Sequence, residues 1–259
     1  MSLLYQVKNS VGIITLNRPE AMNAIDPETL RELRECWLDI SQDANLRCVI
    51  LTAAGSRAFC TGSDLKKTMP PPEGIAELTF GAETTPHLLD GMELVKIPIL
   101  CAINGYAVGG GLELALACDL RIASRNAKFG LPEVRIGSIP GGAGTQRLPR
   151  IIGLSNAMHM LLTGAVVEAE EAHRIGLISH LVESDALMEE ALVIANAIAG
   201  NAPLSVRAIK QLVNDGLEMP LDQAIAHEAF VFGILRDSHD RIEGRKAFQE
   251  KRKPVFEGR

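Results

Sequence analysis

The chain has 259 residues, of which 47% are apolar and 22% are charged, and its formal net charge is −6. This composition is that of a folded protein large enough to bury a sizeable core, and it argues against extended disorder. A net negative chain is a poor electrostatic match for phosphate backbones, so we do not expect nucleic acid as a partner.

The first two thirds of the chain alternate between strand-like and helix-like segments, which indicates α/β architecture. Apolar runs closed by turn residues predict strands. Asp26 followed by Pro27 has the form of a helix start, with an N-cap and a proline at the first helical position. The proline-rich residues 69–74 predict a loop, followed by a weakly periodic stretch over 75–85. The expected elements are strands over 12–17, 47–52, 99–104 and 119–123 and helices over 27–40 and 112–117.

From about residue 155 onward the pattern predicts an almost wholly helical chain. We therefore divide the chain into an α/β core over 1–200 and a C-terminal helical region over 201–259. Helices are expected in that region over 204–214, 221–235 and 238–251.

Two features bear on where the protein works. The longest uncharged apolar stretch, residues 97–112, is too short to span a bilayer, so we expect no membrane partner. The five cysteines form no C-x-x-C pair, and most of them sit among apolar neighbours. Reduced, packed cysteines are typical of a reducing compartment, so a cytoplasmic location is expected.

The segment from Asn104 to Leu114 is the first candidate for chemistry. A strand ends there, the three glycines 109–111 follow, and a helix begins. Glycine lets a ligand approach the backbone closely, and the first N–H groups of a helix have no partner within it. The segment is therefore suited to binding an oxyanion. Glu113 lies among apolar residues in this helix, so it is paired, capping the helix, or catalytic.

Two further segments are candidates. Glu133 follows Pro132 among apolar residues, and its alternative role is a salt bridge to Arg135 or Arg147. The turn over 59–66 could present the backbone N–H of Ser63, although an ordinary Asx-type turn and helix cap would have the same sequence.

Other motifs are absent. A possible G-x-G-x-x-G motif beginning at Gly142 has Arg147 in place of its third glycine, which argues against a dinucleotide site. No H-E-x-x-H occurs, and no histidine or cysteine cluster has zinc spacing, so we expect no metal. The six histidines are scattered and are interpreted as structural or solvated.

These segments together resemble the enoyl-CoA hydratase/isomerase (crotonase) family, and within it enoyl-CoA hydratase most of all. The resemblance covers nearly the whole chain, and the motifs are specific in combination. The matching segments are Leu-Asn-Arg-Pro at 16–19, Met-Asn-Ala at 22–24, residues 97–114 with Cys118-Asp119, residues 129–133 and 137–148, and the tail 250–256.

The resemblance implies a crotonase-like spiral of strand-strand-helix units with a C-terminal helical trimerisation region, as a homotrimer or a dimer of trimers. It implies an oxyanion hole made by the backbone N–H groups of Ser63 and Gly110. It also implies that the segment over 69–85 lies in the loop that shapes the acyl pocket. No cofactor is implied, because coenzyme A is part of the acyl-CoA substrate. The implied CoA-binding residues are Ala24, Thr61, Asp64, Leu65, Lys66 and, from a neighbouring subunit, Phe256.

Members of the family differ mainly at the two acidic positions, and enzymes that hydrate 2-enoyl-CoA carry both. Here both Glu113 and Glu133 are present, which favours hydration to a 3-hydroxyacyl-CoA with these two residues as catalytic groups. Ser63 is a departure, since hydratases often have alanine there, but the expected contact is through the backbone. Two alternatives stay open. The first is an isomerase or specialised dehydratase on the same scaffold, and the second is a non-catalytic protein that binds acyl-CoA or RNA.

Overall fold

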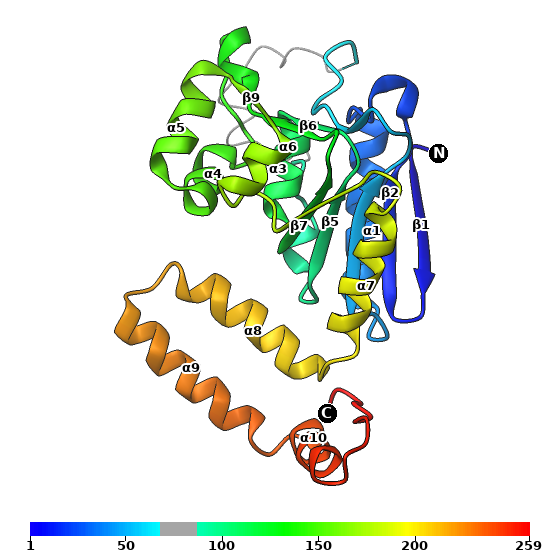
Figure 1. The fold of residues 1–259 in the computed structure, drawn as a ribbon, viewed down its shortest axis with the longest axis vertical. Helices are drawn as coiled ribbons and strands as arrows, with labels where there is room; N and C mark the ends of the chain where they lie inside the picture. The colour runs from blue at the N-terminus through cyan, green and yellow to red at the C-terminus, as the bar shows by residue number, and fades with distance from the viewer. Residues whose placement is uncertain (68–86) are drawn as a thin grey trace, which may run out of the picture.

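The computed structural model describes residues 1–67 and 87–259. Most of the chain forms two β-sheets with helices around them, and three C-terminal helices extend away from this body (Figure 1). The loop expected over 69–74 and the stretch over 75–85 lie outside the described residues.

The larger sheet has six strands in the spatial order β1-β2-β3-β5-β7-β10. Its β1–β2 pair is antiparallel, and the remaining pairs are parallel. The central strands β3 and β5 are buried along their whole length, which explains their continuous apolar sequences. The strands are β1 (Leu3–Lys8), β2 (Val11–Leu16), β3 (Cys48–Ala53), β5 (Ile99–Ile103), β7 (Leu120–Ser124) and β10 (His180–Val182).

The smaller sheet follows the order β4-β6-β8-β9. Its first three strands are parallel, and each follows directly on a strand of the larger sheet: β4 on β3, β6 on β5, and β8 on β7. The carboxyl ends of these three parallel strands therefore meet at one edge. The strands are β4 (Ala58–Cys60), β6 (Tyr106–Val108), β8 (Lys128–Gly130) and β9 (Val166–Glu168).

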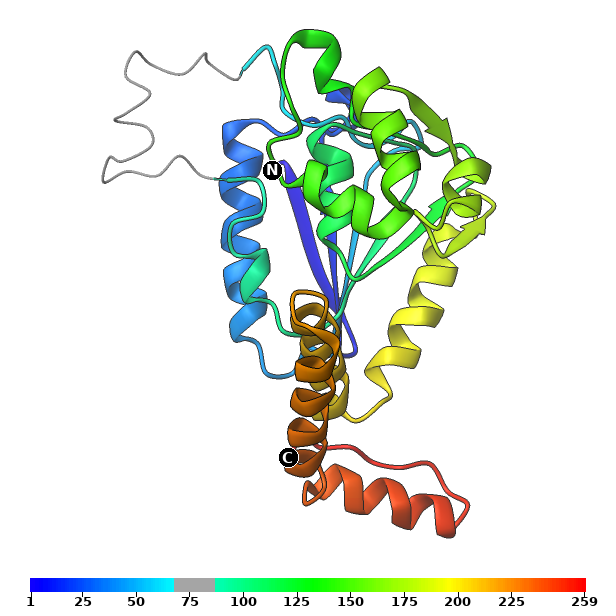
Figure 2. The same cartoon turned by 90° about the vertical axis from the view of Figure 1, so that its left-hand side faces the viewer.

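Helices cover both faces of the larger sheet, with α1 on one side and α7 on the other (Figure 2). Helix α1 begins as predicted, because the Asp26 side chain accepts a hydrogen bond from the Thr29 amide at 2.9 Å and Pro27 opens the first turn. The bounds are α1 (Pro27–Gln42), α3 (Gly110–Ala117), α4 (Gly144–Ile152), α5 (Leu154–Thr163), α6 (Ala169–Arg174) and α7 (Leu187–Ala199), with short 3-10 helices η1 (Pro19–Ala21), η2 (Met92–Leu94) and η3 (Pro132–Ile136).

The C-terminal helices are α8 (Pro203–Gly216), α9 (Leu221–Leu235) and α10 (His239–Gln249). Helix α8 is anchored to the body by Lys210, whose Nζ lies 2.8 Å from an Asp119 carboxylate oxygen and donates to the Val95 and Ile97 carbonyls. Large apolar side chains on α8, at its C-cap Leu217 and on α9 face solvent. They are Ile209, Val213, Leu217, Leu221, Ile225, Phe230, Phe232 and Ile234. The division of the chain at residues 200 and 201 stays a prediction.

In the described ranges, no single helix combines the length and apolarity needed to cross a membrane. Helices α7 and α8 reach those limits only as a pair, which is bent by 105° at its break.

Most predicted elements lie within two or three residues of the observed ones, and α9 has the predicted bounds. The prediction of an almost wholly helical chain beyond residue 155 is wrong at β9 and β10. Each has three residues, too few to show a strand period, and each forms by pairing with a distant strand, β8 or β7. Strand β1 was also missed. It lies at the edge of the sheet and only Leu3 is buried, so its apolar residues do not alternate with polar ones as in a strand with one buried face.

Candidate active site

Two backbone amides come together where β4 and β6 end. Gly110 is the first residue of α3, so its N–H has no acceptor within the helix. A methyl group added at Gly62 would lie 2.9 Å from the Gly110 nitrogen, and one added at Gly110 would lie 3.9 Å from the Ser63 nitrogen. The two segments pack backbone against backbone, and the positive φ of +82° together with the 2.9 Å approach requires glycine at position 62.

The Ser63 segment is held by the chain that precedes α1. Ile25 and Ser63 form an isolated parallel bridge. In it the Ile25 amide donates to the Gly62 carbonyl at 2.8 Å, and the Asp64 amide donates to the Ile25 carbonyl at 2.9 Å. The Ser63 amide is not a donor in this bridge and points away from it.

Glu113 lies in the first turn of α3 and is 4% exposed. Its Oε1 accepts a hydrogen bond from the Gly144 amide at 2.8 Å. A methyl group added at Gly142 would lie only 2.8 Å from Oε2, so the turn before α4 packs directly against this carboxyl group. The backbone of that turn therefore fixes one carboxylate oxygen and closely borders the other.

Glu133 lies in η3, directly after β8. Its Oε1 is 3.2 Å from the position that a side chain on Gly109 would take. Its Oε2 is buried and has no hydrogen-bond partner within the described residues. Burial and the nearby charge of Glu113 raise the pKa of Glu133, against the opposing effect of its own backbone N–H. A carboxyl group in this setting holds its proton to higher pH than an exposed one.

The alternative role for Glu133, a salt bridge to Arg135 or Arg147, is not what the described part of the chain shows. The Arg135 side chain donates to the Thr163 carbonyl, and Arg147 donates to the Gly142 carbonyl. In these ranges neither arginine forms an ion pair with Glu133. Both glutamates therefore approach the glycine-rich start of α3, one from within the helix and one from η3.

The predicted CoA-binding residues fall into two groups. Asp64, Leu65 and Lys66 follow Ser63 directly, and Leu65 is 72% exposed. The Thr61 hydroxyl lies 3.4 Å from the Met22 carbonyl, which joins this turn to the segment that contains Ala24.

Phe256 is not brought to this place within one subunit. Its ring packs near Gly244 of α10, and its carbonyl accepts a hydrogen bond from the Arg47 side chain at 2.7 Å. Its participation from a neighbouring subunit stays a prediction.

Sequence reasoning missed two neighbours of the site. His87 was interpreted as structural or solvated with the other histidines, yet its Nε2 lies 3.1 Å from the Gly141 carbonyl beside the Glu113 carboxyl group. A Leu88 methyl lies 3.2 Å from where a side chain on Gly110 would begin. No local pattern marks either residue, because only the tertiary fold brings the segment at 87–88 against Gly110 and Gly141. In the ranges that the structure describes, no cluster of three or more acidic, histidine or cysteine side chains could hold a metal ion.

Comparison with known proteins shows which family the chain belongs to. The family model described as enoyl-CoA hydratase/isomerase matches residues 6–259. The chain belongs to the enoyl-CoA hydratase/isomerase family. The crotonase-like α/β fold expected from the sequence is thereby confirmed.

Relatives match the chain over its full length. It is 52% identical to the (E)-benzylidenesuccinyl-CoA hydratase of Thauera aromatica over 100% of both chains. It is 40% identical to the short-chain-enoyl-CoA hydratase of Clostridium acetobutylicum, over 97% of this chain and 96% of the relative. The crystal structure of an enoyl-CoA hydratase from Bacillus anthracis superposes with a TM-score of 0.92 at 37% identity, covering 100% of both chains.

Proposed function

We propose that this member of the family adds water reversibly across the C2=C3 double bond of a 2-enoyl-CoA thioester, giving a 3-hydroxyacyl-CoA. The observation that carries the proposal is the pair of carboxyl groups, Glu113 and Glu133, set against the glycine turn that presents the Gly110 amide. Full-length relatives that are named as hydratases support the same reaction.

The two amides supply the electrostatic part of catalysis. Attack of water at C3 moves the π electrons toward C2 and the thioester oxygen, where negative charge develops. The N–H groups of Ser63 and Gly110 donate to that oxygen. Loss of one such donor typically costs about 2.7–4 kcal/mol of transition-state stabilisation.

The two carboxyl groups supply the proton transfers. Glu113 holds the water with its Oε2, because its Oε1 is engaged by the Gly144 amide. As the C3–O bond forms, one water proton passes to Glu113 and Glu133 gives its proton to C2. The raised pKa of Glu133 suits this acid role. Proton transfer from Glu113 to Glu133 through water then restores the starting state, so water is added without any redox change and no cofactor is needed.

The same proposal covers the binding of coenzyme A and the assembly. The CoA portion runs along Ala24, Thr61 and residues 64–66, with Phe256 supplied by a neighbouring subunit. Association into a trimer or a dimer of trimers would cover the exposed apolar side chains of α8 and α9. A cytoplasmic location is supported by the five buried cysteines, which are all free thiols.

A 2-enoyl-CoA with a larger acyl group is a specific candidate substrate for this reaction. The relative of Thauera aromatica is 52% identical over the whole of both chains, above the 40% identity to the short-chain enzyme. Its named substrate carries a phenyl ring and a free carboxylate on the acyl part. We therefore include an aryl-substituted dicarboxylic enoyl-CoA among the proposed substrates.

Mass spectrometry of products from an acyl-CoA panel tests the function. The panel contains crotonyl-CoA, longer straight-chain enoyl-CoAs and (E)-benzylidenesuccinyl-CoA, and hydration adds the mass of one water. Glu113→Gln and Glu133→Gln should each lower kcat by about 10²–10⁴-fold, while the dissociation constant of a saturated acyl-CoA changes little. A product of unchanged mass but shifted double bond would establish isomerisation instead. No turnover of any ester, combined with tight RNA binding, would establish the non-catalytic alternative.

A further inference from the structure

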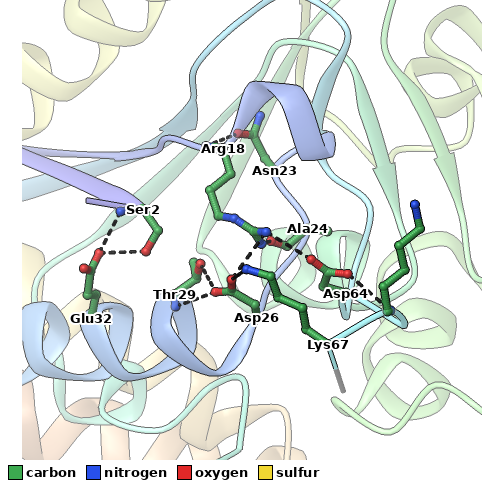
Figure 3. A network of polar contacts seen from close by, with 10 residues as sticks. Ser2, Arg18, Asn23, Ala24, Asp26, Thr29, Glu32, Asp64 and Lys67 are labelled. Carbon is green, nitrogen blue, oxygen red and sulfur yellow. Dashed lines mark hydrogen bonds and ion pairs between the residues drawn. The ribbon is translucent and has the colours of Figure 1, made fainter. Parts of the chain in front are cut away.

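Arg18 contacts the turn that carries Ser63 through Asp64, and the proposed function has not yet assigned it a role. Its side chain is 12% exposed. Figure 3 shows its guanidinium group between two segments, one running into α1 and the other following β4. A nearly buried arginine needs partners for its charge and its donors, and these partners show what it holds together.

The guanidinium group contacts both segments through different nitrogens. Nη1 donates to the Ala24 carbonyl at 2.5 Å. Nη2 lies 3.0 Å from a carboxylate oxygen of Asp64 and 3.3 Å from one of Asp26 (Figure 3). Ala24 and Asp26 flank Ile25, and Asp64 follows Ser63. The arginine therefore joins the chain on both sides of the Ile25–Ser63 bridge.

That bridge determines where the Ser63 amide points. The Gly62 carbonyl and the Ser63 N–H belong to one planar trans peptide unit, so they point in opposite directions. Because the Ile25 amide holds the Gly62 carbonyl at 2.8 Å, the Ser63 N–H is directed to the other side. A shift of the Ile25 segment relative to the Ser63 turn would rotate this peptide unit.

The two carboxylates that contact Arg18, those of Asp26 and Asp64, stay charged near neutral pH. Burial tends to raise the pKa of Asp26, but hydrogen bonds from Lys67 and Thr29 and the charge of Arg18 hold it well below its usual range. The hydrogen bond from Arg18 likewise lowers the pKa of Asp64. The contacts of Arg18 are therefore charge-assisted, which makes them stronger and shorter than neutral ones.

We propose that Arg18 is a positioning residue for the oxyanion hole, because it clamps residues 24–26 to the Ser63 turn and so aims the Ser63 amide at the thioester oxygen. The inference rests on the proposed function, since it assumes that this amide binds the substrate carbonyl. It assigns to Arg18 an effect on transition-state stabilisation, in addition to the effect on CoA binding that follows from its contacts with Ala24 and Asp64.

Two variants and a matched control test the clamp. Arg18→Lys keeps the positive charge but has a single side-chain nitrogen. That nitrogen cannot contact both the Ala24 carbonyl and the two carboxylates, which Arg18 reaches with two different nitrogens. Arg18→Met removes the charge at similar length. Arg125→Met is the control, because Arg125 also contacts two carboxylates, those of Glu170 and Glu183, but lies outside the site.

The decisive measurement is the infrared C=O stretch of bound butyryl-CoA labelled with ¹³C at the thioester carbon. Donation by two amides lowers this frequency, so the wild-type protein and Arg125→Met should show the full shift. Both Arg18 variants should show a smaller shift. We expect their kcat to fall roughly 10- to 100-fold, since small misplacements of catalytic groups have effects of that size. KM should rise as well, because Arg18 also holds Ala24 and Asp64, which are proposed to bind CoA.

The outcomes separate the two proposals. If the wild-type protein binds butyryl-CoA without any shift, the oxyanion hole of the proposed function is wrong. If the wild-type protein shows the shift and Arg18→Lys keeps both the full shift and the wild-type kcat, the clamp is wrong. A fall in kcat with an unchanged C=O frequency would also overturn it. Should Arg18→Met fail to fold, Arg18→Lys decides the question alone.

Discussion

Replacing Gly142 with alanine tests whether the Glu113 carboxyl group must sit where the fold holds it. The new methyl group would lie 2.8 Å from Oε2, 2.9 Å from Cδ and 3.2 Å from Cβ of Glu113. Nonbonded carbon contacts are most favourable at about 3.5–4.0 Å. Because three atoms along the side chain are too close, turning the carboxyl group alone cannot relieve the contact. The Glu113 side chain or the turn has to move.

The size of the effect follows from this geometry. Relieving the contacts requires a movement of roughly 0.5–1 Å. The 2.8 Å hydrogen bond from the Gly144 amide would lengthen with it. A misplacement of about 1 Å can cost 10²-fold in rate, so we expect kcat to fall by roughly 10- to 100-fold. That fall corresponds to about 1.4–2.7 kcal/mol of lost transition-state stabilisation.

The chain offers a matched control in the neighbouring glycine. A methyl group added at Gly141 has no heavy atom within 4 Å, so Gly141→Ala makes the same chemical change without the contact. Steady-state hydration kinetics of both variants on the best substrate of the panel would give kcat and KM. Equal kcat values for Gly142→Ala and Gly141→Ala would refute the reasoning, because the displaced carboxyl group would then have no kinetic effect.

Two other predictions concern charge. Glu113→Gln removes the negative charge that helps raise the pKa of Glu133, so that pKa should fall, which a pH titration of the protonated-carboxyl infrared band would detect. In the proposed mechanism the protonated form of Glu133 is the active one, so hydration by the wild-type protein should slow as pH rises through this pKa. A pKa that stays constant in Glu113→Gln would show that the two carboxyl groups do not interact. Lys210→Met removes the ion pair with Asp119 and two hydrogen bonds to carbonyls, at a site only 17% exposed. We expect a loss of about 1–3 kcal/mol in urea unfolding, and unchanged stability would mean that α8 is not anchored there.

The fold was readable from the sequence wherever local rules decide. Asp26 and Pro27 predict the start of α1 because capping involves neighbouring residues only. The glycine run before Leu112 predicts a helix start with free amides for the same reason. The family motifs added the spiral arrangement, which local patterns cannot give. The three-residue strands β9 and β10 were not predicted, because they form by pairing with the distant strands β8 and β7.

The site followed a similar division. Local features of the amino-acid sequence singled out Glu113, Glu133, the glycine-rich helix start and the turn at Ser63, because carboxylates in apolar segments and glycine turns at helix starts can be recognised locally. The assignment of the oxyanion hole to the amides of Ser63 and Gly110 came from the family resemblance. Only the tertiary structure decided that β4, β6 and β8 lie side by side, so that the turns after them converge. It also decided that Arg18 joins residues far apart in the chain. Contacts between distant segments depend on how whole sheets and helices pack, and this information is not contained in any short stretch of sequence.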